Sequence, residues 1–306
     1  MLRDRVRNEA YQRAIQRVVK PGDVVLDIGA GTGILSIFAA AAGARRVFAA
    51  ERTAVSTVAR AMIERNGFAD RIEVIDGDVE DAVLPEKVDV IVSEWMGGFG
   101  VDENMLAPQV IARQRYLKPG GTMIPARVTA MIAPVAVPEF DDELAYWRSK
   151  PHGVDTSIIA DFTANETFHT QTHLTLESLV APPLAMWTHD AHTVSLEEAD
   201  QSFRCSLTFT ATRDETVSGF AAWFTAELAD GVELTNEIGA PDTHWGRTLF
   251  PLERPTPVKS GDAIGLVLHC DPSHGGSCEM YWAVTIDGTT REFDTRRSRH
   301  ERALLG

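Results

Sequence analysis

The sequence is poor in cysteine and has no long apolar run, and each absence argues against a class of protein. Its three cysteines, an odd number without C-x-x-C spacing, are Cys205, Cys270 and Cys278. This pattern disfavours a disulfide framework or a zinc site and is typical of a reducing compartment, so we expect a cytoplasmic protein without a structural metal. No stretch of about 18 apolar residues occurs and the first residues are charged, so neither a membrane span nor a signal peptide is predicted.

Positive charge is also scarce. Lys and Arg total 29 against 44 Asp and Glu, which gives a formal net charge of −15. An acidic protein is poorly suited to bind a phosphate backbone, so we expect no nucleic-acid partner. A cationic substrate suits this charge better, although solubility alone explains many acidic proteins. The length of 306 residues allows one large domain or two ordinary ones.

The first part of the chain alternates between apolar strand-like and amphipathic helix-like segments. Such alternation predicts a parallel sheet with helices on both faces. The expected helices are 3–19, 34–42, 54–66 and 105–116, and the expected strands are 24–26, 46–50, 71–75, 88–92 and 122–124, the last after a turn at 118–121.

Beyond Pro125 the pattern changes to a period of two, which is clearest at 203–209 and typical of half-solvated antiparallel strands. We expect strands at 128–135, 202–211, 217–227, 263–269 and 281–286, in a sandwich or a barrel. A polar, helix-compatible insertion at 138–165 contains Trp147. The predicted fold is therefore α/β: a Rossmann-like parallel-sheet domain over 1–125, followed by an antiparallel β-domain over 126–306.

A glycine-rich turn after the first predicted strand indicates a ligand site. Asp27 precedes Gly29, Gly31 and Gly33 at the start of a helix, where glycines permit a tight turn and close approach of a ligand. The spacing is G-x-G-x-G, whereas the dinucleotide fingerprint places its third glycine one residue later.

Acidic residues follow the next two predicted strands. Glu51 ends the second strand, where a carboxylate can accept both ribose hydroxyls, and Val79 and Glu80 follow the third strand, where they can border an adenine. All lie at the carboxyl ends of strands, where open α/β sheets bind ligands. Together with the glycine turn, they favour an S-adenosyl-L-methionine site over a nicotinamide site.

Two carboxylates follow the fourth predicted strand. Glu94 and Glu103 are nine residues apart, and Gly97, Gly98 and Gly100 between them allow the loop to fold back. Paired carboxylates are costly unless a cation lies between them, and the planar guanidinium is the matching cation. Its pKa is above about 12 and it has no free lone pair. Two carboxylates can hold its charge away from the attacking nitrogen and aim that nitrogen at a methyl donor.

Several segments together resemble the protein arginine methyltransferase family. The Ser-Glu-Trp-Met-Gly run with a second Glu nine places on is similar to the double-glutamate loop of that family. The matching segments are 1–7 with Tyr11 (opening segment), 25–35 (cofactor motif), 93–103 (double-glutamate loop), 117–121 (following turn) and 243–245 (Thr-His-Trp loop). The resemblance covers nearly the whole chain.

The resemblance implies a role for residues at the cofactor. Arg7 would pair with the cofactor's carboxylate, and Gly29 would lie against its amino-acid end. Glu51 would hold the ribose, and Glu80 the adenine. Family members also carry a lid helix with spaced aromatics before the opening segment; the sequence begins at Met1, so either a shortened start or a more open site is expected.

The resemblance also implies an acceptor site and an assembly. Glu94 and Glu103 would clamp the guanidinium. His244 would pair with Asp4 as a proton acceptor, and Trp245 would form a wall of the pocket. The insertion at 138–165 corresponds to a dimerisation arm, so a homodimer is expected.

Four functions compete at this point. The first is methylation of arginine in proteins or peptides. The second is methylation of free arginine or another guanidino compound in biosynthesis, which needs the same two glutamates. A nucleic-acid methyltransferase is disfavoured, because Ser93 to Met96 stand where an Asn/Asp-Pro-Pro-aromatic run is expected. A catalytically silent scaffold is disfavoured by the intact glutamates and glycines.

Overall fold

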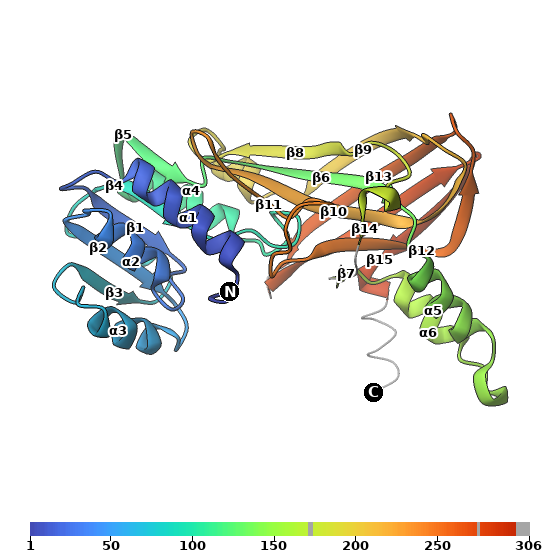
Figure 1. The fold of residues 1–306 in the computed structure, drawn as a ribbon, viewed down its shortest axis with the longest axis horizontal. Helices are drawn as coiled ribbons and strands as arrows, with labels where there is room; N and C mark the ends of the chain where they lie inside the picture. The colour runs from blue at the N-terminus through green and yellow to red at the C-terminus, as the bar shows by residue number, and fades with distance from the viewer. Residues whose placement is uncertain (171–173, 274–275, 298–306) are drawn as a thin grey trace.

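The computed structural model describes residues 1–170, 174–273 and 276–297. The molecule is elongated, with a parallel sheet at one end and antiparallel sheets at the other (Figure 1). None of the helices in these described ranges is long and apolar enough to cross a membrane.

The N-terminal sheet is parallel, in the order β3-β2-β1-β4-β5. Side chains on its two faces enter two separate apolar clusters. One includes α1, α2, α3 and the first part of α4, and the other includes the last part of α4. Burial on both faces explains the unbroken apolar runs in the sequence. The elements are α1 (Arg5–Val18), β1 (Val24–Ile28), α2 (Ile34–Ala41), β2 (Arg46–Glu51), α3 (Ser56–Arg65), β3 (Ile72–Asp76), β4 (Val88–Ser93), α4 (Leu106–Tyr116) and β5 (Leu117–Ile124).

The predicted turn at 118–121 is wrong. These residues lie inside β5, which already pairs with β4 at Leu117 and pairs again from Thr122. The register shifts between these two points, and Gly120 has a φ of 75° there. A Pro-Gly-Gly run therefore forms an irregularity within a strand rather than a break before one.

The C-terminal part forms two antiparallel sheets that share an apolar core. One has the order β7-β12-β10-β6-β8 with β11 beside β10, and the other has the order β15-β14-β13-β9. Phe220, Phe250 and Trp282, from both sheets, belong to one cluster. The strands are β6 (Arg127–Val135), β7 (Phe168–Thr170), β8 (Leu184–Asp190), β9 (Phe203–Thr210), β10 (Glu215–Ala229), β11 (Val232–Thr235), β12 (Arg247–Val258), β13 (Ala263–Ser273), β14 (Gly276–Ile286) and β15 (Thr289–Asp294), with a short helix α7 (Leu196–Ala199) between β8 and β9.

Five of these strands are not predicted from the sequence: β7, β8, β11, β12 and β15. The reason is clearest in β12, where Pro251, Pro255 and Pro257 count against a strand. β7 pairs only with the start of β12, from Arg247 to Leu249. The prolines lie beyond that stretch, where the missing N–H groups interrupt no ladder with β7.

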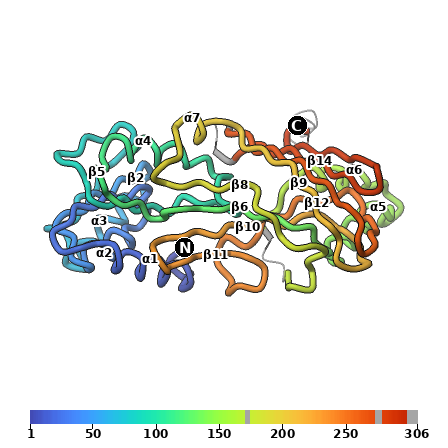
Figure 2. Tube along the Cα trace, turned by 90° about the horizontal axis from the view of Figure 1, so that it is seen from above, coloured from blue at the N-terminus to red at the C-terminus, as the bar shows by residue number. Residues whose placement is uncertain are grey.

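The predicted helical insertion is confirmed. It contains α5 (Pro138–Arg148), a 3-10 turn (Pro151–Gly153) and α6 (Ser157–Ala164), and it projects beside β7 and β12 (Figure 1). At the other end of the β-domain, α1 contacts β10 and β11 as well as α2 (Figure 2). The first helix is therefore packed against both parts of the molecule.

One glycine in β10 is required by the close approach of β12. A Cβ on Gly219 would overlap the carbonyl oxygen of Phe250 and crowd Pro251. We expect Gly219→Ala to lower the free energy of unfolding by about 1–3 kcal/mol, the usual cost of overpacking. Urea denaturation measures this effect. Gly265→Ala in β13 is the control, because its Cβ would make an ordinary contact with Thr285; equal losses in both variants would contradict the argument.

Candidate active site

The glycine turn after β1 has a left-handed backbone. Gly29, Gly31 and Gly33 have φ angles of 67°, 56° and 80°. A Cβ on Gly29 would meet no atom within 4 Å, and one on Gly31 would meet only the Gly29 carbonyl oxygen at 3.9 Å. The turn therefore borders open space that a ligand can fill against bare backbone.

A cavity of about 150 Å³ lies against this turn. Gly29, Glu51, Val79 and Glu80 line it, so residues after β1, β2 and β3 converge on it. Met105, just before α4, lines the same cavity. The structure thus brings together four of the residues that the sequence analysis assigned to the cofactor.

Glu51 is held as an ionised acceptor. Its Oε1 accepts hydrogen bonds from the amide and hydroxyl of Thr53 at 2.8 and 2.6 Å, and Oε2 accepts one from the Gly31 amide at 2.8 Å. Burial acts to raise the pKa of Glu51, but these hydrogen bonds outweigh it and leave the pKa lowered. The carboxylate also fixes the glycine turn to the end of β2.

The segment after β3 is positioned by the end of α4. The Tyr116 hydroxyl donates to the carbonyl oxygens of Val79 and Ala82 at 3.2 and 2.6 Å, and Arg115 donates to the carbonyl of Glu80. These contacts fix the backbone beside the cavity, with Val79 and Glu80 on its lining.

Asp27 does not line the cavity. It is fully buried under the turn, where Oδ2 accepts from the Ser36 hydroxyl at 2.6 Å and Oδ1 has no hydrogen-bond partner among the described residues. Burial raises its pKa to about 6. Asp27 is thus placed behind the glycine turn rather than on the cavity surface.

The loop after β4 folds back on itself, as its glycines predicted. The Gly97 amide donates to the Gly100 carbonyl at 3.0 Å. Inside the turn, the buried Asp102 carboxylate accepts from the amides of Gly98 and Phe99 at 2.9 and 3.1 Å. A Cβ on Gly97 would overlap that carboxylate, so glycine is required there.

The fold-back places Glu94 and Glu103 near one another. The Glu94 side chain is 7% exposed, and its Oε2 accepts from Arg7 Nε and Nη2 at 3.2 and 3.1 Å. Burial raises the pKa of Glu94 despite the nearby Arg7 and His244. Burial, then repulsion from Glu94 and from Asp102, raises the pKa of Glu103 to about 7. Glu94 is therefore close enough to disfavour the charge of Glu103.

Asp4 and His244 form the predicted pair. Asp4 Oδ2 accepts from the His244 backbone amide at 2.8 Å and lies 2.8 Å from the ring Nδ1, while Oδ1 caps α1 at the Arg7 amide at 2.9 Å. Burial acts to raise the pKa of Asp4, but its hydrogen bonds with Arg7 and His244 leave the pKa lowered. One carboxylate thus joins the start of α1 to the loop before β12.

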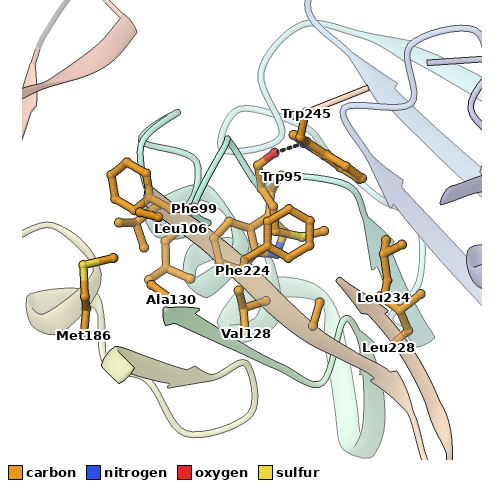
Figure 3. Close-up of a cluster of buried hydrophobic side chains, with 14 of the residues drawn as sticks. Trp95, Phe99, Leu106, Val128, Ala130, Met186, Phe224, Leu228, Leu234 and Trp245 are labelled. Carbon is orange, nitrogen blue, oxygen red and sulfur yellow. Dashed lines mark hydrogen bonds between the residues drawn. The ribbon is translucent and has the colours of Figure 1, made fainter. Parts of the chain in front are cut away.

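Trp245 packs onto the glutamate loop. Its Nε1 donates to the Met96 carbonyl at 2.7 Å, a contact drawn in Figure 3, and its ring lies 4.1 Å from the His244 ring and 5.0 Å from Phe224. The indole forms an apolar wall on the loop that begins with Glu94.

Glu103 faces a second cavity, of about 200 Å³. Asp102, Glu166, His169 and Thr248 also line it. The segment from Phe99 to Met105 therefore borders this cavity at Glu103 and the glycine-turn cavity at Met105.

Sequence reasoning missed Asp102 and Asn236. Asp102 precedes Glu103, so the sequence shows an acidic residue in the loop. It does not show that this side chain turns into the loop and accepts hydrogen bonds from the loop amides. Asn236 is 1% exposed and follows β11. An isolated asparagine after a strand carries no sequence signal of its own.

Comparison with known proteins decides the family. Residues 126–285 match the family described as the arginine methyltransferase oligomerization subdomain, and residues 12–125 match ribosomal protein L11 methyltransferase. The chain belongs to the protein arginine N-methyltransferase family. It is 35% identical to protein arginine N-methyltransferase PRMT10 of Arabidopsis thaliana over 88% of this chain and 78% of that protein. It is 34% identical to protein arginine N-methyltransferase 6 of Xenopus laevis over 89% of this chain and 83% of that one.

Solved structures of family members agree with the fold. The Trypanosoma brucei PRMT1 enzyme-prozyme complex with AdoHcy matches with a TM-score of 0.87 and 28% identity, over 96% of both chains. The Arabidopsis thaliana protein arginine methyltransferase 10, described in an open conformation, matches with a TM-score of 0.79 and 30% identity, also over 96% of both chains. The Rossmann-like parallel sheet followed by antiparallel sheets is the architecture of this family.

The geometry around Glu51 predicts its contribution to cofactor binding. We expect Glu51→Ala to weaken S-adenosylmethionine binding about tenfold or more, because hydrogen bonds to a charged group are worth roughly 1.5–3 kcal/mol. Isothermal titration calorimetry measures the dissociation constant. Glu73→Ala is the matched control, since Glu73 pairs with Arg46 on the surface away from the cavity. A dissociation constant unchanged by Glu51→Ala would remove Glu51 from the site.

Proposed function

We propose that this chain transfers a methyl group from S-adenosyl-L-methionine to a guanidino nitrogen of arginine in proteins or peptides. The observation that carries the proposal is the pair formed by the buried Glu94 side chain and the more exposed Glu103, brought together by a loop whose next residues border the glycine-turn cavity. Such a pair has a chemical use when a delocalised cation lies between the carboxylates.

The residues around the first cavity fit the cofactor. The open space at Gly29 and Gly31 accepts a ligand against the backbone, and Glu51 offers an ionised carboxylate for ribose hydroxyls. Val79 and Glu80 border the position proposed for the adenine. When bound, the cofactor supplies an electrophilic methyl group on its sulfonium. Arg7, which contacts Glu94, is proposed to reach the cofactor's carboxylate from the same helix turn.

The carboxylates act on the acceptor. Glu94 and Glu103 would hold the guanidinium in one plane and draw its charge from the attacking nitrogen, which aims that nitrogen at the methyl group. Methylation releases one proton from this nitrogen. His244 is proposed to accept it, oriented by the ionised Asp4, and Trp245 would exclude water from one side.

The names of the relatives support protein arginine as the substrate. Free arginine, the alternative, needs the same two glutamates. The net charge of −15 favours cationic acceptors of either kind. We also propose that the chain divides into a cofactor unit over 1–125 and an acceptor unit over 126–306, and that it acts in the cytoplasm, since its three cysteines carry free thiols.

We propose that the arm formed by α5 and α6 makes a homodimer. Tyr146, Val154 and Ile158 on the arm are 49%, 59% and 50% exposed, an apolar surface that a second copy would cover. Trp147, expected to anchor the dimer, is half-buried and packs against the Tyr146 ring at 5.1 Å. The matched oligomerization subdomain, which includes the arm, supports this assembly.

The carboxylate pair makes a prediction about turnover. Glu94→Gln and Glu103→Gln each preserve shape and remove one charge, so single-turnover methyl transfer should fall by roughly a hundredfold or more. The fold-reduction in rate of the double variant should be smaller than the product of the two single fold-reductions, because the two carboxylates act as a unit. In the native chain, kcat/KM should fall as the pH drops through about 7, where Glu103 of the free protein becomes protonated.

The acceptor in this assay separates the competing functions. An Arg-Gly-rich peptide, its lysine counterpart and free arginine are compared by mass spectrometry, with Glu73→Gln as the surface control. Transfer to the arginine peptide alone supports the proposal. Equal use of lysine, or near-native rates in Glu94→Gln, would reject the guanidino assignment, and transfer to free arginine alone would favour the biosynthetic alternative.

The arm makes a prediction about assembly. Ile158→Asp places a charge on the proposed interface, so we expect the dimer to dissociate at micromolar concentration. Light scattering coupled to gel filtration measures the mass. Val83→Asp is the matched control, because Val83 is 87% exposed on the cofactor unit. A native chain that is monomeric and fully active would contradict the proposal.

A further inference from the structure

A single buried side chain connects the two loops that form the acceptor site. Asn236 Nδ2 donates to the carbonyl of Gly98 at 2.8 Å and to the carbonyl of Gly246 at 2.7 Å. Gly98 lies between Glu94 and Glu103, and Gly246 directly follows Trp245. The side chain reaches across 138 residues of sequence to the first of these contacts.

The same asparagine is itself fixed by the sheet. Its Oδ1 accepts from the Phe224 amide of β10 at 2.8 Å. The amide group therefore uses its acceptor and both of its donor hydrogens on three backbone groups. Because its acceptor and both donor hydrogens are paired, the side chain is held in one orientation. The two carbonyls are therefore held at fixed positions relative to β10.

Gly98 has little freedom to move by other means. Its amide donates to Asp102 at 2.9 Å while its carbonyl accepts from Asn236, so both of its polar groups are bound. A Cβ on Gly98 would overlap the Thr248 hydroxyl and crowd the His169 ring. The tip of the hairpin is thus enclosed between its own Asp102, Asn236 and the β7–β12 pair.

We infer that Asn236 is a positioning residue for the proposed methyl transfer, setting the glutamate hairpin in register with the His244–Trp245 loop through Gly98 and Gly246. Asn236 acts through backbone carbonyls, and the guanidinium itself is bound by Glu94 and Glu103 in the proposed function. The inference rests on the proposed function of the glutamate pair. Trp245 makes a second tie between the loops, at the Met96 carbonyl, but on the Glu94 side of the hairpin.

Substitutions of Asn236 separate positioning from filling of space. Asn236→Asp keeps the size and the acceptor for Phe224 but places an oxygen against the two carbonyls, whereas Asn236→Ala removes the group. Both variants should lower kcat for an arginine peptide by roughly tenfold to hundredfold, because small displacements at a reacting centre are costly. The dissociation constant for S-adenosylmethionine should stay within about twofold, since the cofactor cavity is lined mainly by residues after β1, β2 and β3, and the loop reaches it only at Met105, beyond the hairpin.

The pH profile provides a readout that general destabilisation would not change. The titratable groups around Glu103 are Glu94 and Asp102 on its own loop, and Glu166 and His169 across the cavity. A loosened hairpin gives Glu103 more solvent and moves it from Glu94, so its pKa should fall toward the usual value. The acid limb of the kcat/KM profile should then shift to lower pH in both Asn236 variants.

Thr212→Val is the matched control, because it also removes a donor to a backbone carbonyl, that of Val180, away from both loops. Its kcat and pH profile should match the native chain. Amide hydrogen exchange should increase over residues 94–104 in both Asn236 variants and stay native in Thr212→Val. This exchange readout tests the inference even if the native chain shows no methyl transfer, which would reject the proposed function.

Near-native kcat and pH profile in Asn236→Asp would overturn the inference, since the side chain would then only fill space. Unchanged exchange over 94–104 would overturn it as well. A kcat loss with an unshifted profile and equal loss in Thr212→Val would assign the effect to global stability and equally reject a positioning role.

Discussion

The structure depends on bringing a buried carboxylate, that of Glu94, close to a second carboxylate, that of Glu103. Burial raises the pKa of Glu94, and partial burial together with repulsion from Glu94 and Asp102 raises the pKa of Glu103, so the ionised form of each carboxyl is disfavoured. The surrounding contacts offset that cost. Arg7 neutralises Glu94 from the first turn of α1, and the hairpin is fixed by backbone hydrogen bonds to Asp102 rather than by further charge. A cation with a planar array of donors would complete the arrangement.

Two residues at the start of α1, Asp4 and Arg7, hold both His244 and Glu94 in place. Asp4 caps the helix and holds His244, and Arg7, whose amide Asp4 accepts, holds Glu94. The helix itself packs on α2 and on β10 and β11. Any tilt of α1 would therefore move the His244 and Glu94 contacts together, so the geometry of the proposed proton acceptor and that of the guanidinium clamp are linked through one helix end.

The sequence predicted the parts of the molecule whose signals are local. The glycine turn, Glu51 and the alternating elements were identified because strand ends, glycine spacing and periodicity are short-range patterns. The fold-back at Gly97 was predicted for the same reason. β12 was missed because its prolines count against a strand, although they lie beyond the stretch that pairs with β7. Asn236 was missed because its partners Phe224, Gly98 and Gly246 come from different segments, and the residues next to Asn236 in sequence give no sign of these contacts.

This contrast explains how the two halves of the active site differ in construction. The cofactor side is built from consecutive strand ends of one parallel sheet, so each contact such as Glu51 to Gly31 spans about one β-α-β unit. The acceptor side joins the loop after β4 to β7, β12 and the turn after β11, and its contacts link residues far apart in sequence, such as Gly98 and Asn236, which are 138 residues apart. On the proposed assignment, cofactor binding uses cavity residues that all precede Pro125, whereas the clamp also uses contacts from the antiparallel sheets. Loss of the contacts between these two parts should therefore abolish acceptor use before it abolishes cofactor binding.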